Sequence, residues 1–329
     1  MADVARAAGV SVPTVSKVVN GRYGVAPATV KRVTDVVAEL SYETSLVASS
    51  LRRQQTNVIG ILVAEFESFS VELLKGISTA ATGTGYELLA YSALAPGGIS
   101  TGWERRSLSR LAGTLIDGAI IVTPTLLIPT TSIPVIAIDP HTGLGGPSTI
   151  DSDNVGGARA ATGHLIELGH RRIAHIRGRV DLASAEQREV GYRESLAHAD
   201  IPFDPTLVCD GGYQAALTID VARELLTRPD RPTAVFAAND ISALAVLGVA
   251  RELGLRVPDD LSVVGFDDIP ESTRSLPPLT TVAQPLHDLG AQALKMLVKL
   301  LAGEPVPQQV HLPADLVVRA STGPVPTRP

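Results

Sequence analysis

Short, uninterrupted apolar runs recur between residues 58 and 267, and they constrain the fold of this 329-residue chain more than any other feature. Such runs are typical of strands that are buried on both faces of a parallel sheet. Amphipathic helical patterns fall between most of them. The predicted strands are 58–63, 86–92, 118–123, 133–139, 172–178, 207–211, 233–239 and 261–267, and the predicted helices include 71–84, 155–168, 187–199, 217–226 and 241–253. This alternation predicts a doubly wound α/β fold, built twice.

Two segments do not fit the alternation. Only nine residues, 124–132, connect the third run to the fourth, and a helical crossover usually needs about a dozen. We therefore expect no helix in that connection. The segment 93–103 has no pattern that assigns it to a helix or a strand.

The first twenty residues have a different pattern, that of two short helices joined by a tight turn. Ala5, Gly9 and Val15 have the spacing of a helix-turn-helix, in which a small residue allows close helix packing and a glycine permits the left-handed turn. Ser11 can accept hydrogen bonds from the free amides of the second helix, and Pro13 suits its first turn. This arrangement leaves outward-facing side chains on the second helix, at Val12, Pro13, Thr14, Ser16 and Lys17.

A third helical pattern follows, with valines at helical spacing from Val30 to Val37 and then Leu40. An ordinary helical hairpin could explain the first two helices alone, because small apolar residues at this spacing are usually core. Three helices in fewer than fifty residues are instead typical of a DNA-binding module, in which the second helix enters the major groove.

The distribution of charge agrees with a DNA-binding head. The whole chain carries a formal charge of −6, which by itself argues against nucleic acid. Residues 1–57, however, hold seven basic and four acidic side chains, whereas the remainder is strongly acidic. A basic head on an acidic body directs DNA binding to the head.

Composition also limits the compartment and the chemistry. The chain has no apolar stretch long enough to span a membrane and no signal-peptide pattern. Its single cysteine, Cys209, excludes an internal disulfide and a cysteine-based metal site. We therefore expect a cytoplasmic protein.

Several motifs resemble the lactose/galactose-repressor (LacI/GalR) family of bacterial transcription regulators. They are VARAAGVSVPTVSKVVNG, VAPATVKRVTDVVAELSY and ASSLRRQQTNVIGILV near the start, and GHLIELGHRRIAHI, REVGYRESL, PTAVFAANDISALAVL, VPDDLSVVGFDDIP, PPLTTVAQP and LVVRAST further on. They match in order and in spacing, and the resemblance extends to Ser321. Members of this family usually have a helix-capping threonine before the first helix. Here only Met1 and Ala2 precede Asp3, so we expect that helix to lack a side-chain cap and the true start to lie upstream.

The resemblance implies a helix-turn-helix domain over 1–44, a hinge helix or linker over 45–57, and an effector-binding and dimerisation core over 58–329. The core would be a periplasmic-binding-protein-like pair of lobes, the first made of about 58–156 and 286–318 and the second of about 157–285 and 319–329. The chain would cross between lobes near 155–157, 284–287 and 318–320. Leu51 matches the leucine that wedges into the DNA minor groove, although a leucine packed on the body would explain it too. The residues expected to contact DNA are Val12, Pro13, Thr14, Ser16, Lys17, Asn20 and Leu51.

The resemblance also implies an effector site between the lobes, where strand ends converge. The candidate residues are Phe69, Arg188, Tyr213, Asn239 and Asp267. An arginine, an amide, a carboxylate and an aromatic face together suit a sugar, but they could equally hold a purine or another polar metabolite. Helix capping would explain one residue of each of the pairs 239–240 and 267–268 without a ligand, although it would not explain both.

These observations favour a ligand-responsive repressor that binds a palindromic operator as a homodimer, with a small-molecule effector, a sugar being favoured. A binding protein without DNA activity is the main alternative. An enzyme is not expected, because no catalytic constellation stands out, and no cofactor is predicted. His164, His170 and His175 have separations that do not place them on one helix face, so helix packing or a dipole contact explains them better than a metal site does.

Overall fold

A computed structural model describes residues 1–19, 23–40, 55–93, 101–128, 131–141 and 145–326. The chain divides into two compact units, Met1–Thr56 and Asn57–Pro329. Within the described residues, no helix is long and apolar enough to cross a membrane.

The first unit is the predicted three-helix bundle, with α1 (Ala2–Ala8), α2 (Val12–Val19) and α3 (Pro27–Glu39). Gly9 ends α1 in the left-handed conformation, with φ 62°. Ser11 Oγ accepts from Thr14 N at 3.3 Å, which confirms the predicted cap of α2. The helix α1 begins without a side-chain cap. The buried core of the bundle consists of Val4, Ala5, Ala8, Val15 and Val33, whereas Val30 and Leu40 are exposed.

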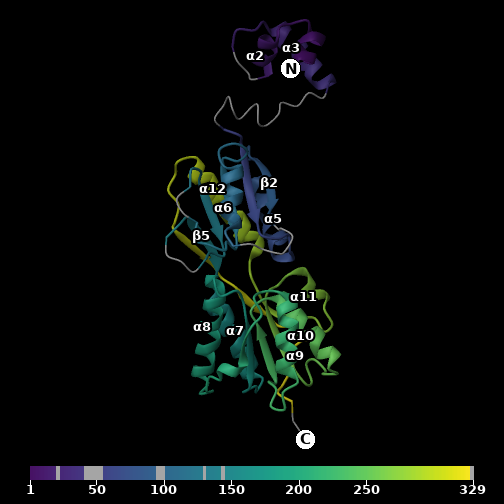
Figure 1. The fold of residues 1–329 in the computed structure, drawn as a ribbon, viewed down its shortest axis with the longest axis vertical. Coiled ribbons are helices and arrows are strands. Elements are labelled where there is room, and N and C mark those ends of the chain that lie inside the picture. Colours follow the sequence, from purple (N-terminus) through teal and green to yellow (C-terminus); the bar gives the residue numbers. More distant parts are fainter. Residues whose placement is uncertain (20–22, 41–54, 94–100, 129–130, 142–144, 327–329) are drawn as a thin grey trace. The chain divides into compact units, whose positions relative to one another are not determined.

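The second unit consists of two lobes, each with a six-stranded sheet between helices (Figure 1). In order across it, the first sheet contains β11 (Gln309–Leu312), β5 (Ser148–Ser152), β4 (Val135–Ile138), β3 (Gly118–Val122), β1 (Val58–Val63) and β2 (Glu87–Ser92), all paired in parallel. Alternate residues of its central strands face opposite sides. On one side they pack against α5 (Ser68–Ala81) and α12 (Leu286–Leu301), and on the other against α6 (Trp103–Leu111).

The second sheet contains β12 (Asp315–Val317), β10 (Thr280–Ala283), β9 (Ser262–Asp267), β8 (Ala234–Ala237), β6 (Ile173–Arg177) and β7 (Val208–Asp210). All its pairs are parallel except β10 with β12. One face packs on α7 (Asn154–Glu167) and α8 (Ala183–His198), and the other on α9 (Ala215–Leu226) and α10 (Asp240–Glu252). The short helices η1 (Pro205–Leu207) and α11 (Pro270–Arg274) complete this lobe.

The structure confirms the doubly wound fold class and all eight predicted strands, and it corrects several details. The strands β2 and β7 are not buried on both faces, because each lies at an edge of its sheet. The helix α6 begins at Trp103, where the sequence predicted nothing. The connection 124–132 contains no helix in its described part, as expected.

The lobe boundaries also need correction. The chain enters the second lobe at about residue 153, returns at 284–285, and crosses for the third time at 313–314. The predicted third crossing, near 318–320, is too late, and the segment 286–318 is not wholly in the first lobe. The reason is that β12 already pairs with β10, with Thr281 opposite Val317.

Candidate functional site

A cavity of about 430 Å³ lies between the two lobes, where the carboxyl ends of strands from both sheets meet. Such a position is where ligands bind in open α/β folds. The first lobe supplies Ala64, Glu65, Glu67, Phe69, Ser70, Thr123 and Asp139, and the second supplies Arg179, Leu182, Arg188, Gly212, Tyr213, Gln214, Ala215, Ala216, Asn239, Ile241 and Asp267. Because both lobes line it, a ligand held there would contact both.

All five residues that the sequence singled out for the effector line this cavity: Phe69, Arg188, Tyr213, Asn239 and Asp267. Four come from the second lobe. Phe69, from the first turn of α5, is the only one from the first lobe. The structure therefore brings the predicted set together, and the effector-binding role of each residue remains a prediction.

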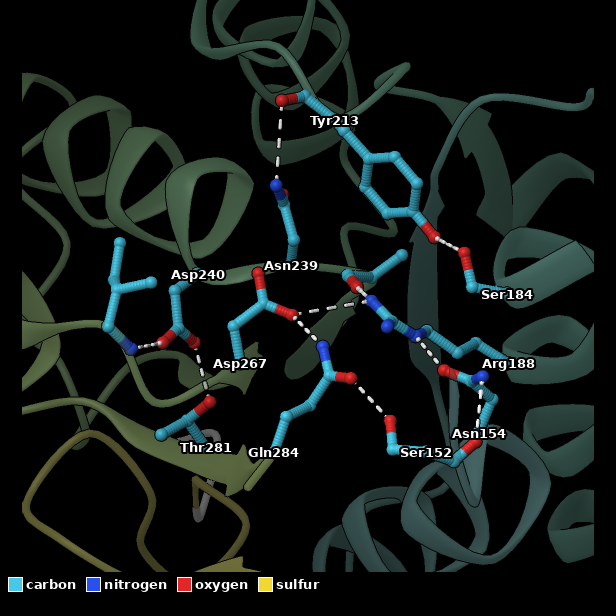
Figure 2. Close-up of polar contacts among 12 residues, drawn as sticks. Ser152, Asn154, Ser184, Arg188, Tyr213, Asn239, Asp240, Asp267, Thr281 and Gln284 are labelled. Atoms are coloured by element: carbon cyan, nitrogen blue, oxygen red, sulfur yellow. Dashed lines mark hydrogen bonds and ion pairs between the residues drawn. The ribbon is translucent and has the colours of Figure 1, made fainter. Parts of the chain in front are cut away.

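Arg188 is a buried cation near the centre of the site (Figure 2). Its Nε donates to Asn154 Oδ1 at 2.9 Å, and its Nη1 donates to the carbonyl oxygen of Ala238. Nη1 also lies 3.6 Å from Asp267 Oδ1. The guanidinium stacks on the Phe266 ring, with Cζ 3.7 Å from the ring centroid. The side chain is thus fixed by four partners, and among the described residues none accepts from Nη2.

Asp267 ends β9 and carries the carboxylate that faces Arg188. Its Oδ1 accepts from Gln284 Nε2 at 2.6 Å. Burial raises the pKa of Asp267 well above its usual range, and the Arg188 guanidinium opposes that rise. The backbone of Asp267 has φ 121°, in a region that side chains rarely adopt, which is a strain typical of functional positions.

Asn239 both caps a helix and faces the cavity. Its Oδ1 accepts from Ser242 N at 3.0 Å, so the capping role considered for it is real. Its neighbour Asp240 points elsewhere and accepts from Thr281 Oγ1 (Figure 2). Asp240 also accepts from Ile269 N and Ser272 Oγ. The two residues therefore have different roles. Asn239 lines the cavity, whereas Asp240 connects α10 to α11 and β10 of the second lobe.

Tyr213 presents its ring to the cavity from a left-handed backbone, with φ 62°. Its hydroxyl bonds Ser184 Oγ at 3.0 Å, and burial raises its pKa to about 12, so it is a neutral aromatic surface at physiological pH. Gly178 lies against this ring. A Cβ at residue 178 would come within 2.0 Å of the tyrosine Cζ, so only glycine leaves room for the ring.

Sequence reasoning missed several polar residues of the cavity, among them Asp139, Glu67 and Arg179. Asp139 directly follows β4, so the strand-end rule that found Asp267 could have found it as well. Its Oδ1 is buried without a hydrogen-bond partner among the described residues, and burial raises its pKa while Arg188 lowers it. Burial raises the pKa of Glu67 to about 7. Arg179 is already paired with Asp181, at 2.7 Å.

Five of the predicted DNA-contacting residues lie on one helix, α2. Val12, Pro13 and Lys17 are exposed, and Thr14 and Ser16 are half-buried. Thr14 Oγ1 also bonds Ser11 Oγ at 2.8 Å, so its hydroxyl helps to cap the helix. Asn20 and Leu51 lie outside the described residues.

The three histidines have separate structural roles. His164 bonds Thr322, and His170 bonds Thr233 and Ser262. His175 stacks between Tyr192 and Phe236, and burial lowers its pKa to about 4. No group of possible metal ligands occurs in the described part of the chain.

Comparison with known proteins links the head and the core to one kind of protein. Residues 1–45 match the family described as bacterial regulatory proteins, lacI family, and residues 162–322 match the periplasmic binding protein-like domain. The chain is 36% identical to the HTH-type transcriptional regulator CelR of Thermobifida fusca, over 97% of this chain and 96% of that protein. It is 34% identical to the ribose operon repressor of Halalkalibacterium halodurans, with 97% and 96% covered.

Solved structures agree with this match. A complex of the transcriptional regulator CelR with cellobiose superposes with a TM-score of 0.72 at 34% identity, covering 97% of this chain and 98% of the other. The Lac repressor dimer bound to operator and the anti-inducer ONPF gives a TM-score of 0.81 at 29% identity, with 98% of both chains covered.

Proposed function

The chain belongs to the LacI family of bacterial regulatory proteins, and from that premise we propose that it is a transcription repressor that binds a palindromic operator as a dimer and responds to a sugar. The observation that carries the proposal is the cavity between the lobes, which gathers Arg188, Tyr213, Asn239 and Asp267 at strand ends. The three-helix head supplies the DNA-binding activity. As a regulator of transcription, the protein would act in the cytoplasm.

The head would read DNA through α2. The exposed side chains of Val12 and Pro13 stand at its start, where apolar groups of a recognition helix meet base edges and thymine methyl groups. Lys17, exposed on the same helix, is placed to contact a phosphate. One such head offers few base contacts, so specific affinity calls for two heads on symmetric half-sites. We place the head at 1–44 and the hinge at 45–57.

The chemistry of the cavity favours an uncharged ligand rich in hydroxyl groups. Arg179 is paired with Asp181, and Arg188 with Asp267, so the two cations of the cavity are already balanced. Asp139 and Glu67 add carboxyl groups that can accept from hydroxyls. Phe69 and Tyr213 provide aromatic surface for the C–H face of a sugar ring. An anionic ligand such as a sugar phosphate would find both of these cations already paired with carboxylates. The relatives support this reading, since one is named a ribose operon repressor and another is complexed with cellobiose.

The response would follow from the position of the cavity. A ligand that contacts Phe69 and Asp139 on one lobe and Arg188 and Asp267 on the other would bind most tightly to the conformation with one particular angle between the lobes. Because the head precedes the first lobe in the chain, a change of that angle in each subunit would change the separation of the paired hinges. The ligand would thereby shift the population that is competent to bind operator.

The rival functions have less support. A binding protein without DNA activity does not need a head that is a complete three-helix bundle with its own core. An enzyme needs a nucleophile or a metal, and we propose no catalytic role for the cavity, whose polar side chains are fixed by one another.

The test is operator binding by the full chain. Binding is measured by fluorescence anisotropy with the DNA upstream of its own gene. We expect tight binding to a full palindrome, weaker binding to one half-site, and a change of affinity on addition of cellobiose, ribose or another neutral sugar. Lys17→Ala should weaken binding, whereas the matched variant Lys31→Ala, in an exposed ion pair of α3, should not. A chain that binds no palindrome, or binds a half-site equally well, would contradict the proposal.

A further inference from the structure

A closed ring of polar contacts includes the pair Arg188 and Asp267 (Figure 2). Starting from Ser152, the hydroxyl donates to Gln284 Oε1, and Gln284 Nε2 donates to Asp267 Oδ1 at 2.6 Å. Asp267 Oδ1 faces Arg188 Nη1 at 3.6 Å, and Arg188 Nε donates to Asn154 Oδ1 at 2.9 Å. Asn154 Nδ2 then donates to the carbonyl oxygen of Ser152 at 3.0 Å, which closes the ring.

Three members of the ring lie where the chain crosses from one lobe to the other. Ser152 is the last residue of β5 in the first sheet, and Asn154 starts α7 of the second lobe, so both lie at the first crossing between lobes. Gln284 lies between β10 and α12, at the second crossing. The ring therefore joins two of the three crossings to Arg188 and Asp267, two of the charged residues of the cavity.

Gln284 is the only member whose side chain bonds both a first-lobe group and Asp267. Its amide can donate to a carboxylate and accept from a hydroxyl at the same time, which neither an aliphatic nor an ionised side chain can do. Gln284 does not line the cavity, so a ligand would reach it through Asp267.

Resting on the proposed function, we propose that Gln284 is a positioning residue that ties the ligand-facing carboxylate of Asp267 to Ser152 of the first lobe, and so couples ligand binding to the angle between lobes. A ligand that draws the Asp267 carboxylate toward itself changes the hydrogen bond to Gln284. Because Gln284 also holds Ser152, that change reaches the crossing strands. Asn154 carries the same coupling from Arg188 to the first crossing.

The first experiment needs neither ligand nor DNA. Urea unfolding of the full chain, followed by fluorescence of Trp103, the single tryptophan and a buried residue of the first lobe, gives a midpoint for the wild type, Ser152→Ala, Gln284→Leu and the double variant. We expect each single change to lower the midpoint, and Ser152→Ala to add less than half of its own effect when Gln284 is already replaced. Fully additive midpoints would overturn the inference, whatever the chain binds.

The second experiment measures ligand affinity by calorimetry with the full chain, using cellobiose and D-ribose as probes. We expect Gln284→Leu to weaken the binding of whichever probe the wild type takes by about tenfold, equal to ~1.4 kcal/mol. Glu271→Ala is the matched control. It removes another hydrogen bond between lobes, Ser68 Oγ to Glu271 Oε1 at 2.7 Å, which lies outside the ring, and should change affinity less than twofold.

Gln284→Glu separates positioning from simple packing. An ionised carboxylate at residue 284 repels Asp267, whereas a protonated one can donate to Asp267 and accept from Ser152. The charged groups that also act on Asp267 are Arg188, Asp240 and Glu67, and they are the same in the variant. The affinity of Gln284→Glu relative to wild type should therefore recover as the pH is lowered from 8 to 5. A ratio that does not change with pH would refute the positioning role, and it would do so even if Gln284→Leu failed to fold.

If neither probe binds, the sugar proposal fails, while the unfolding experiment still tests whether Gln284 couples Ser152 to Asp267. If a probe binds and the unfolding effects are additive, the ring inference fails while the effector site stands.

Discussion

Replacing Arg188 with alanine tests the site most directly, because this residue is both buried and charged. The change removes one of the few cationic groups that can reach a ligand in the cavity. Each hydrogen bond from a charged donor contributes about 1.5–3 kcal/mol, so the loss of one such bond should weaken effector binding by about 10- to 150-fold.

The structure adds a stability cost that the sequence did not reveal. Arg188→Ala leaves Asp267 without its cation and leaves Asn154 Oδ1 and the Ala238 carbonyl without their donor. Removing one partner of a buried ion pair costs about 3–5 kcal/mol. We therefore expect the variant to fold less stably, and its operator binding without effector to be retained only where the chain remains folded.

The cost should depend on pH in a defined direction. Burial already raises the pKa of Asp267 in the folded protein, so its ionised form is disfavoured there, and Arg188 is the group that most opposes this. Without Arg188 the pKa rises further. At a pH where Asp267 is protonated in both proteins, only the lost hydrogen bonds separate them, whereas at higher pH the variant must also bury an unpaired charge or keep a proton. The difference in unfolding free energy should thus be larger at pH 8 than at pH 5.

The assay is urea unfolding of wild type and variant at both pH values, with calorimetric titration of the effector. Arg193→Ala is the matched control, because Arg193 lies on the same helix in an exposed ion pair with Glu189 and should cost no more than about 1 kcal/mol. An Arg188 variant that loses no more stability than the control, shows no pH dependence and still binds effector would refute the reasoning.

Three further predictions follow from single residues. A Cβ at Gly76 would lie 2.0 Å from the backbone oxygen of His287, so Gly76→Ala should disturb the packing of α5 on α12 and destabilise the protein by about 1–3 kcal/mol or more. Gly163→Ala, in open space on α7, should instead stabilise the protein by about 0.4–1 kcal/mol. Urea unfolding measures both changes. Burial raises the pKa of Glu67 to about 7, so the folded protein favours the protonated side chain and its stability falls as the pH rises through that value. Glu67→Gln should flatten this dependence on pH and should be more stable than the wild type at pH 8. Thermal unfolding across the pH range measures both effects. Lys17→Ala should reduce the salt dependence of operator binding by about one unit of log–log slope without changing sequence preference, and an unchanged slope would exclude a phosphate contact.

The sequence predicted the central strands well because those strands are apolar on both faces. It missed β5, β10, β11 and β12. These strands are short and partly polar, as the sequence STIDS of β5 (148–152) illustrates. Short, partly polar strands of this kind are held by their neighbours more than by their own composition. The misplaced third crossing has the same cause, since β12 is identified only by its antiparallel pairing with β10.

The candidate site was predictable where it follows strand ends. Asn239 and Asp267 each stand at or just after the carboxyl end of an apolar run, and the same rule applies to Asp139. Glu67 could not be found in this way, because its raised pKa arises from burial that only the folded chain produces. The role of Gln284 was equally hidden, because nothing in its neighbourhood along the chain indicates that Ser152 and Asp267 will bracket it.

The cavity's acceptors bear on specificity as much as on affinity. A hydrophobic pocket discriminates weakly between ligands that differ by one hydroxyl, whereas a site with buried polar groups rejects a ligand that leaves them unpaired. Asp139 Oδ1 and the carboxylate of Asp267 are such groups, and they belong to opposite lobes. A hydroxylated ligand that donates to both satisfies each acceptor only when the lobes stand at the matching angle. Under the proposed function, recognition of the ligand and selection of the lobe angle would be one event, since the same hydrogen bonds would accomplish both.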